Sequence, residues 1–270
     1  MRFKRFCSLS IAAAIGMSIL AGTAAAKETT TGVGFDFNQN DGGFTPIFSD
    51  YPNEQGVEEF YELRSGHEEV PIADAGKGLC LSGNNHSDDL FKGYYKELSG
   101  LVPETEYQFT VRFQLATNVE GDMVGIGGGP GGSVFVKCGV ASKEPESSLD
   151  ALNHFRLNID KGSQSQSGAD MTVVGTLAKE ENNRPGEYEF NEIETKVIAR
   201  TDEAGTAYLV IGTDSGFEGV TSYYLDDISV SWADTATASI TRGDAVKMLF
   251  DHAHRWAPHL YGCGLGCSLR

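Results

Sequence analysis

The chain has 270 residues, of which 40% are hydrophobic, and a formal net charge of −17 at pH 7. This acidic charge repels phosphate backbones and anionic lipid, which argues against nucleic acid and membrane surfaces as partners. Five cysteines are too few for a disulfide-built scaffold, so we expect apolar burial to form the core of one large domain.

Residues 1–26 have the pattern of a secretory signal peptide. Three basic residues precede the apolar stretch 11–20, and the run from Ala24 to Ala26 fits a cleavage site. The stretch is shorter than the ~20 residues that span a bilayer, so no membrane insertion is expected after cleavage. We therefore predict an exported protein, whose mature chain carries a formal charge of −17 − 3 = −20.

The segment 34–46, "GFDFNQNDGGFTP", is rich in side-chain oxygens. Asp36, Asn38 and Asp41 are cation ligands by residue type, although their spacing is not that of an EF-hand.

Sugar binding needs exposed aromatic rings with amide and carboxylate groups beside them. Tryptophan is scarce here, so tyrosine must supply the rings. Neighbouring residues on a strand point to opposite faces, so one ring of the pair Tyr94-Tyr95, and one of Tyr223-Tyr224, is expected to be exposed. The polar loop "GNNHSDD" offers the polar groups. The predicted ligand-binding residues are Tyr51, Asn84, Asn85, His86, Asp88, Tyr94 and Tyr95.

Apolar residues alternate with polar ones along most of residues 33–232. The clearest examples are "TEYQFTVRFQLAT", "SVFVKCGV" and "TAYLVIGT", each with one apolar face. Gly- and Asn-rich turn signals separate these runs, and no amphipathic helix interrupts them. This pattern predicts an all-β, antiparallel β-sandwich.

The run "GIGGGPGGS" lacks the Gly-Lys-Ser/Thr ending of a phosphate-binding loop, and no helix follows it. We expect a flexible hairpin loop. Cys138 falls on the apolar face of its strand, whereas Cys80 lies between Leu79 and Leu81 and points to the other face. This favours free buried thiols over one disulfide.

The segment "TSYYLDDISVSW", residues 221–232, reads as a strand that contains two carboxylates. Strict alternation places Asp226 on the apolar face with Ile228 and Val230, and Asp227 on the solvent face. A bulge between Leu225 and Ile228 would exchange these roles. An unpaired inward carboxylate is costly, so Asp226 is expected either to bind a cation or to accept hydrogen bonds.

Three segments resemble carbohydrate-binding-module jelly rolls of the galactose-binding type. "GLVPETEYQFTVRFQLAT" is similar to a hallmark strand of that family, "TSYYLDDISVSW" to its closing strand, and "GFDFNQNDGGFTP" to its opening strand. The resemblance implies a jelly roll over residues 27–233, in which the first and last strands run side by side and a structural calcium ion often joins them. By position, Asp226 matches the closing-strand ligand and Asp36 the opening-strand acid, which is Glu in the family; Asn38 and Asp41 are weaker candidates.

Residues 234–270 form a small-residue linker, a helical pattern and an irregular tail. "ASITRGDAVKMLFDHA" resembles one helix of an S-layer homology domain, which implies attachment to cell-wall glycan; the rest of such a domain is absent.

Together these features predict a secreted or cell-surface module that binds a polysaccharide or cell-wall glycan and holds structural calcium. Two alternatives stay open: a polysaccharide-active enzyme on the same scaffold, and a structural surface protein without a small ligand. Acidic clusters such as Glu62, His67, Glu68 and Glu69 fit no hydrolase or lyase motif, so no catalytic residue is assigned.

Overall fold

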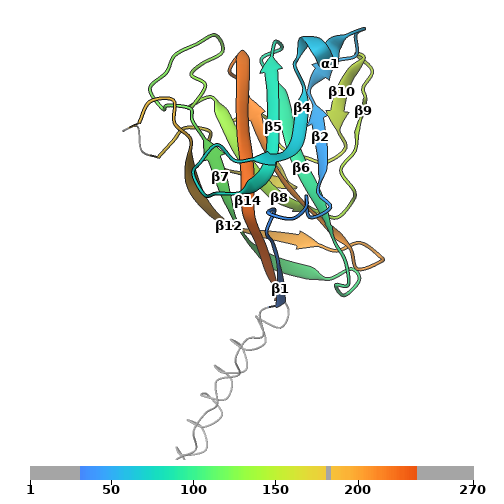
Figure 1. Cartoon of the computed structure of the whole chain (residues 1–270). Coiled ribbons are helices and arrows are strands. Elements are labelled where there is room, and N and C mark those ends of the chain that lie inside the picture. Colours follow the sequence, from blue (N-terminus) through green and yellow to red (C-terminus); the bar gives the residue numbers. More distant parts are fainter. Residues whose placement is uncertain (1–30, 181–183, 236–270) are drawn as a thin grey trace, which may run out of the picture.

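The computed structural model describes residues 31–180 and 184–235, which fold into an antiparallel β-sandwich (Figure 1). From β5 to β8, and again from β11 to β14, successive strands alternate between the two main sheets. The predicted all-β jelly roll is confirmed. The predicted signal peptide and the S-layer-like helix lie outside the described residues. Within the described part of the chain, no helix is long and apolar enough to cross a membrane.

Sheet A has the strand order β12-β7-β14-β5-β4, with β1 also paired to β14. Its strands are β1 (Thr31–Phe35), β4 (Arg64–Glu69), β5 (Lys77–Asn85), β7 (Glu106–Thr117), β12 (Glu189–Arg200) and β14 (Gly219–Asp234). The first and last described strands therefore lie side by side, as the resemblance implied: Phe35 faces Ile228, and Thr31 faces Trp232.

Sheet B has the strand order β11-β8-β13-β6-β2. Its strands are β2 (Thr45–Ser49), β6 (Leu90–Leu98), β8 (Val134–Ala141), β11 (Met171–Thr176) and β13 (Ala207–Ser215). A small third sheet contains β3 (Tyr51–Pro52), β9 (Ser147–Leu149) and β10 (His154–Leu157), and the helix α1 (Val57–Phe60) follows β3. We call residues 142–170, which include β9 and β10, the insertion.

The predicted apolar faces form the core between the sheets. Along β7, the alternate residues from Tyr107 to Leu115 are buried and all belong to one cluster. Val136 and Cys138 of β8 and Ile211 of β13 join it from sheet B. Each of these strands has one face in the core, which is why period-two patterning predicted them correctly.

Both described cysteines are free and buried, as predicted. Cys138 lies in the core between the sheets, whereas Cys80 packs with Ala116 and Tyr224 in a separate cluster.

The closing strand β14 contains a β-bulge at the two aspartates. Its pairing with β7 shifts register between Asp226 and Ser229, and Asp227 has a left-handed φ of 45°. The core therefore takes Leu225 and, three residues later, Ile228. Strict alternation was therefore wrong that Asp226 shares a face with Ile228. Asp226 is nevertheless largely buried and Asp227 exposed, so the bulge does not exchange their exposures as expected.

The glycine run joins β7 to β8 and lies tightly against its neighbours. A Cβ atom on Gly127 would lie 2.0 Å from the carbonyl oxygen of Gly216, and one on Gly129 would lie 2.2 Å from that of Met123. These glycines are required for close backbone approach.

Candidate functional site

Asp226 lies at the point where β14 changes its partner strand along one of its two edges. The strand pairs with β5 up to Leu225 and with β1 from Ile228 onward, so the bulge occupies the junction. The amide of Asp227 donates to Asp226 Oδ1 at 2.8 Å. Burial, together with the negative charges of Asp227 and Asp36, raises the pKa of the Asp226 carboxyl. Asp36 therefore lies near enough to Asp226 for its charge to act on that carboxyl.

The remaining predicted metal ligands take part in the turn after β1. Asp36 accepts hydrogen bonds from the amide and side chain of Asn38, at 2.8 and 2.7 Å, and Asp41 accepts one from the amide of Gly43. Among the described residues, Asp36, Asp41 and Asp226 do not form a compact set of three carboxylates. An ion at this junction would depend on Asp226, Asp36 and backbone carbonyls.

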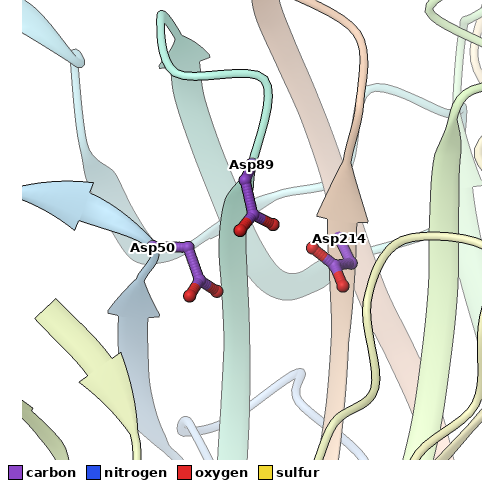
Figure 2. Close-up of side chains that lie close together, drawn as sticks. All are labelled: Asp50, Asp89 and Asp214. Carbon is purple, nitrogen blue, oxygen red and sulfur yellow. The ribbon is translucent and has the colours of Figure 1, made fainter. Parts of the chain in front are cut away.

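The described residues do bring together three other carboxylates, which sequence reasoning missed. Asp50 follows β2, Asp89 precedes β6 and Asp214 lies on β13 (Figure 2). One oxygen of each lies within 4.8 Å of the others, which is close enough for the three to share a cation.

Amino groups and a guanidinium of this chain already occupy that cluster. Lys161 Nζ lies 2.7 Å from Asp214 Oδ2 and 3.2 Å from Asp50 Oδ2. Arg156 Nη1 lies 2.6 Å from Asp50 Oδ1 and 3.2 Å from Asp89 Oδ2. Lys137 Nζ lies 2.9 Å from Asp214 Oδ2. Each of the three carboxylates is therefore ion-paired within the chain.

The electrostatics agree with an ion-paired cluster. Burial alone would raise the pKa of Asp214, but the charges of Lys161 and Lys137 outweigh it and lower that pKa. Burial and the neighbouring carboxylate of Asp50 raise the pKa of Asp89 to about 6. A cleft of about 230 Å³ opens beside Asp50, Asp89 and Lys161. Because these carboxylates are held by cations of the same chain, we interpret the cluster as a structural one.

The predicted ligand-binding residues do not form one site. Tyr51 is buried against Tyr61 and Phe155, and Tyr94 lies in the main core, so neither ring has a free face. The expectation that Tyr223 or Tyr224 is exposed is wrong: Tyr223 lies in the main core, and Tyr224 is buried in the cluster of Cys80 and Ala116, against Tyr188.

The loop "GNNHSDD" lies at one end of the sandwich. Asn85 is buried and donates to the backbone carbonyls of Ser215 and Phe217, each at 2.9 Å. Asn84 donates to Glu62, and the exposed His86 ring stacks on Phe60 with centroids 4.0 Å apart. These residues and Asp88 precede β6, whereas Tyr95 lies near its far end, so they lie apart from Tyr95.

Tyr95 contributes to an open cleft on the outer face of sheet B. The cleft measures about 330 Å³ and is lined by Gly43, Thr45, Tyr95, Lys96, Glu97, Ser99, Glu144 and Tyr208. The two tyrosine rings lie 6.5 Å apart, with an interplanar angle of 63°. The Tyr95 hydroxyl donates to Glu144 Oε1 at 3.0 Å, which fixes the ring from the insertion. This is an aromatic platform surrounded by polar groups.

The charge of the cleft is mildly negative, because Glu97 and Glu144 outnumber Lys96. Partial burial and the Glu144 carboxylate raise the pKa of Tyr95, so its hydroxyl stays a donor near neutral pH. Partial burial and the Glu144 carboxylate also raise the pKa of Tyr208. The arrangement is suited to hydrogen bonding and ring stacking with a neutral ligand.

Sequence reasoning missed Tyr208 and Glu144. A signal for Tyr208 was present, because in "TAYLVIGT" it alternates with the inward Ala207 and Leu209 and must point outward. Glu144 carried no such signal, because the insertion brings it to Tyr95 from a distant part of the sequence.

No protein-family model matches the chain, and no curated protein matches it by sequence. Among solved structures, it is similar to the CBM22-1 xylan-binding domain of a Paenibacillus barcinonensis protein, with 9% identity and a TM-score of 0.36, covering 75% of this chain and 94% of that one. It is also similar to the CBM22-1 and GH10 modules of a Clostridium thermocellum endo-1,4-β-D-xylanase complexed with xylohexaose, with 17% identity and a TM-score of 0.36. That match covers 73% of this chain and 28% of the xylanase chain.

A third similar structure is a CBM61 module in complex with β-1,4-galactotriose, with 8% identity and a TM-score of 0.27, covering 70% of this chain and 87% of that one. These neighbours are carbohydrate-binding modules.

Proposed function

We propose that this protein is an exported carbohydrate-binding module-like protein that binds a neutral polysaccharide or cell-wall glycan in the cleft of Tyr95 and Tyr208. The observation that carries the proposal is the pair of partly exposed rings set among hydroxyl, ammonium and carboxylate groups. The apolar face of a sugar stacks on such rings, while its hydroxyls exchange hydrogen bonds with Glu97, Glu144 and Lys96.

The charge balance favours neutral glycans over uronic-acid or sulfated ones. Glu97 and Glu144 lie in the cleft, and the whole chain is strongly acidic. Both would repel an anionic polymer.

Affinity electrophoresis in gels that contain xylan, galactan, β-glucan or mannan tests the proposal. Tyr208→Ala removes one ring and should weaken binding about 10- to 100-fold, the loss expected for one aromatic contact. Phe60→Ala removes a more exposed ring elsewhere on the molecule and should leave binding unchanged. Wild-type protein that migrates alike in every gel would refute the proposal, and release of reducing ends would indicate an enzyme instead.

Export is part of the proposal and is supported by the signal-peptide pattern of residues 1–26. Amino-terminal sequencing of protein recovered from a culture medium should then begin at Lys27.

We also propose a calcium ion at the bulge, held by Asp226, Asp36 and nearby carbonyl oxygens. Hard oxygen ligands suit calcium. A cation there would relieve the repulsion among Asp226, Asp227 and Asp36 and would fasten β1 to β14.

Thermal unfolding with calcium and with EDTA tests this site. Calcium at saturating concentration should raise the melting temperature by about 5–10 °C over EDTA. Asp226→Asn should remove most of that shift, whereas the matched control Asp227→Asn should retain it. Identical melts of the wild type would disprove the site; a shift lost in Asp89→Asn and kept in Asp226→Asn would move the ion to the Asp50 cluster.

A further inference from the structure

Four loops meet at the end of the sandwich opposite the start of β1, and we call them the loop end (Figure 1). They are residues 53–62, 86–89, 118–133 and 216–220. The amide of Glu218 donates to the carbonyl oxygen of Ile126 at 2.9 Å. The amide of Asn84 donates to the carbonyl oxygen of Tyr61 at 2.6 Å. The Phe60 ring stacks on His86, and a Cβ atom on Gly127 would lie 3.0 Å from Asp88 Oδ1, so neighbouring contacts join all four loops.

The loop end exposes an unusual amount of apolar side chain. Val124 is 91% exposed, Ile126 70% and Phe60 61%. Of the nine large apolar side chains that are exposed in the described part of the chain, five lie here: Phe60, Met123, Val124, Ile126 and Val220. A group of exposed apolar side chains of this kind is typical of an interaction site.

The fold holds these side chains outward. The glycines of 125–129 let the backbone press against its neighbours: Gly125 lies against the Phe217 ring, and Gly127 against the backbone of Gly216. Val124 and Ile126 are therefore displayed from a braced loop.

The loop end is also acidic. It contains no lysine or arginine and nine acidic residues: Glu54, Glu58, Glu59, Glu62, Asp88, Asp89, Glu120, Asp122 and Glu218. Among the ion pairs of the described residues, only Asp89 of this set takes part, with Arg156 and Lys161. Glu58 and Glu59 directly precede Phe60 in the sequence, and Glu120 and Asp122 come shortly before Val124.

We propose that the loop end binds a cationic, apolar protein segment, in which lysine or arginine alternates with aliphatic or aromatic residues. Charge complementarity selects this partner, because the acidic groups attract a basic segment while the exposed apolar side chains bury its non-polar face. The same charges repel an anionic lipid surface and a second copy of this end.

A fluorescent amphipathic peptide of lysine and leucine is the probe. Its anisotropy should show binding that weakens with salt, whereas a glutamate–leucine peptide and a lysine–serine peptide should bind at least about tenfold more weakly. The double variant Val124→Ser with Ile126→Ser should weaken binding of the lysine–leucine peptide about tenfold or more. Glu120→Gln with Asp122→Asn should weaken it at low salt and reduce its salt dependence.

The matched control is Val102→Ser with Ile198→Ser, which alters two apolar side chains that are exposed elsewhere. Equal losses in the control and loop-end variants, or no loss in either, would overturn the proposal, because binding would then not depend on the apolar side chains of the loop end. Concentration-dependent dimerisation, or binding to neutral phosphatidylcholine vesicles, that is lost in the loop-end variant would overturn it in favour of a second copy or a lipid surface. Tyr208→Ala should bind the peptide normally, so a failure of the glycan proposal can be told apart from a failure of the peptide proposal.

Discussion

Lys92 lies between the two sheets, where its side chain is fully buried. Its amine donates to the backbone carbonyl of Thr221 and, at 2.6 Å, to the Thr221 hydroxyl, and it lies 5.8 Å from the centre of the Tyr223 ring. Among the ion pairs of the described residues, none involves Lys92, and burial lowers its pKa to about 7. It joins β6 to β14 as a hydrogen-bond donor that is largely uncharged at mildly alkaline pH.

This burial predicts a specific pH dependence of stability. Above pH 7 the unfolded chain still holds the Lys92 proton that the folded chain has lost, so the free energy of unfolding rises with pH. Between pH 7 and pH 9 it should rise by about 2 kcal/mol more in the wild type than in Lys92→Met. Urea unfolding of both proteins at both pH values measures this difference, and parallel changes would contradict it.

The insertion packs against the outer face of sheet B. Lys137 of β8 donates to the carbonyls of Lys161 at 2.7 Å and Gln166 at 3.0 Å, in addition to its ion pair with Asp214. The glycine at position 139 lets the insertion approach, since a Cβ there would lie 1.9 Å from the carbonyl of Asp170. One ammonium group therefore fastens the insertion to the sheet.

Replacing Lys137 should loosen the insertion selectively. Lys137→Met leaves two carbonyls without this donor and removes one partner of the buried Asp214, at a cost of about 3–5 kcal/mol. Hydrogen exchange should accelerate over residues 158–171 and remain slow in β7 and β12. Arg112→Met, which breaks the exposed pair with Glu194, should cost about 1 kcal/mol or less. Equal destabilisation by both variants would contradict the anchoring role.

At the scale of the whole molecule, the sequence predicted those strands that have a single face in the core. It did not predict the buried outer face of sheet B, because Lys137 and Asp214 alternate with apolar residues as solvent-facing residues do. Their burial depends on the insertion. Of the residues that line the Tyr95 cleft, the sequence predicted only Tyr95, because segments that are distant in sequence assemble the cleft.

The position of β14 has a consequence for the order of assembly. This strand lies between β5 and β7 and also pairs with β1, so it contributes to three of the ladders of sheet A. A nascent chain that has not yet reached Gly219 can make the β4–β5 and β7–β12 pairs, but has nothing to connect them. Completion of sheet A thus waits until β14 has been synthesised, so the contacts that join its two halves form late in the synthesis of the domain.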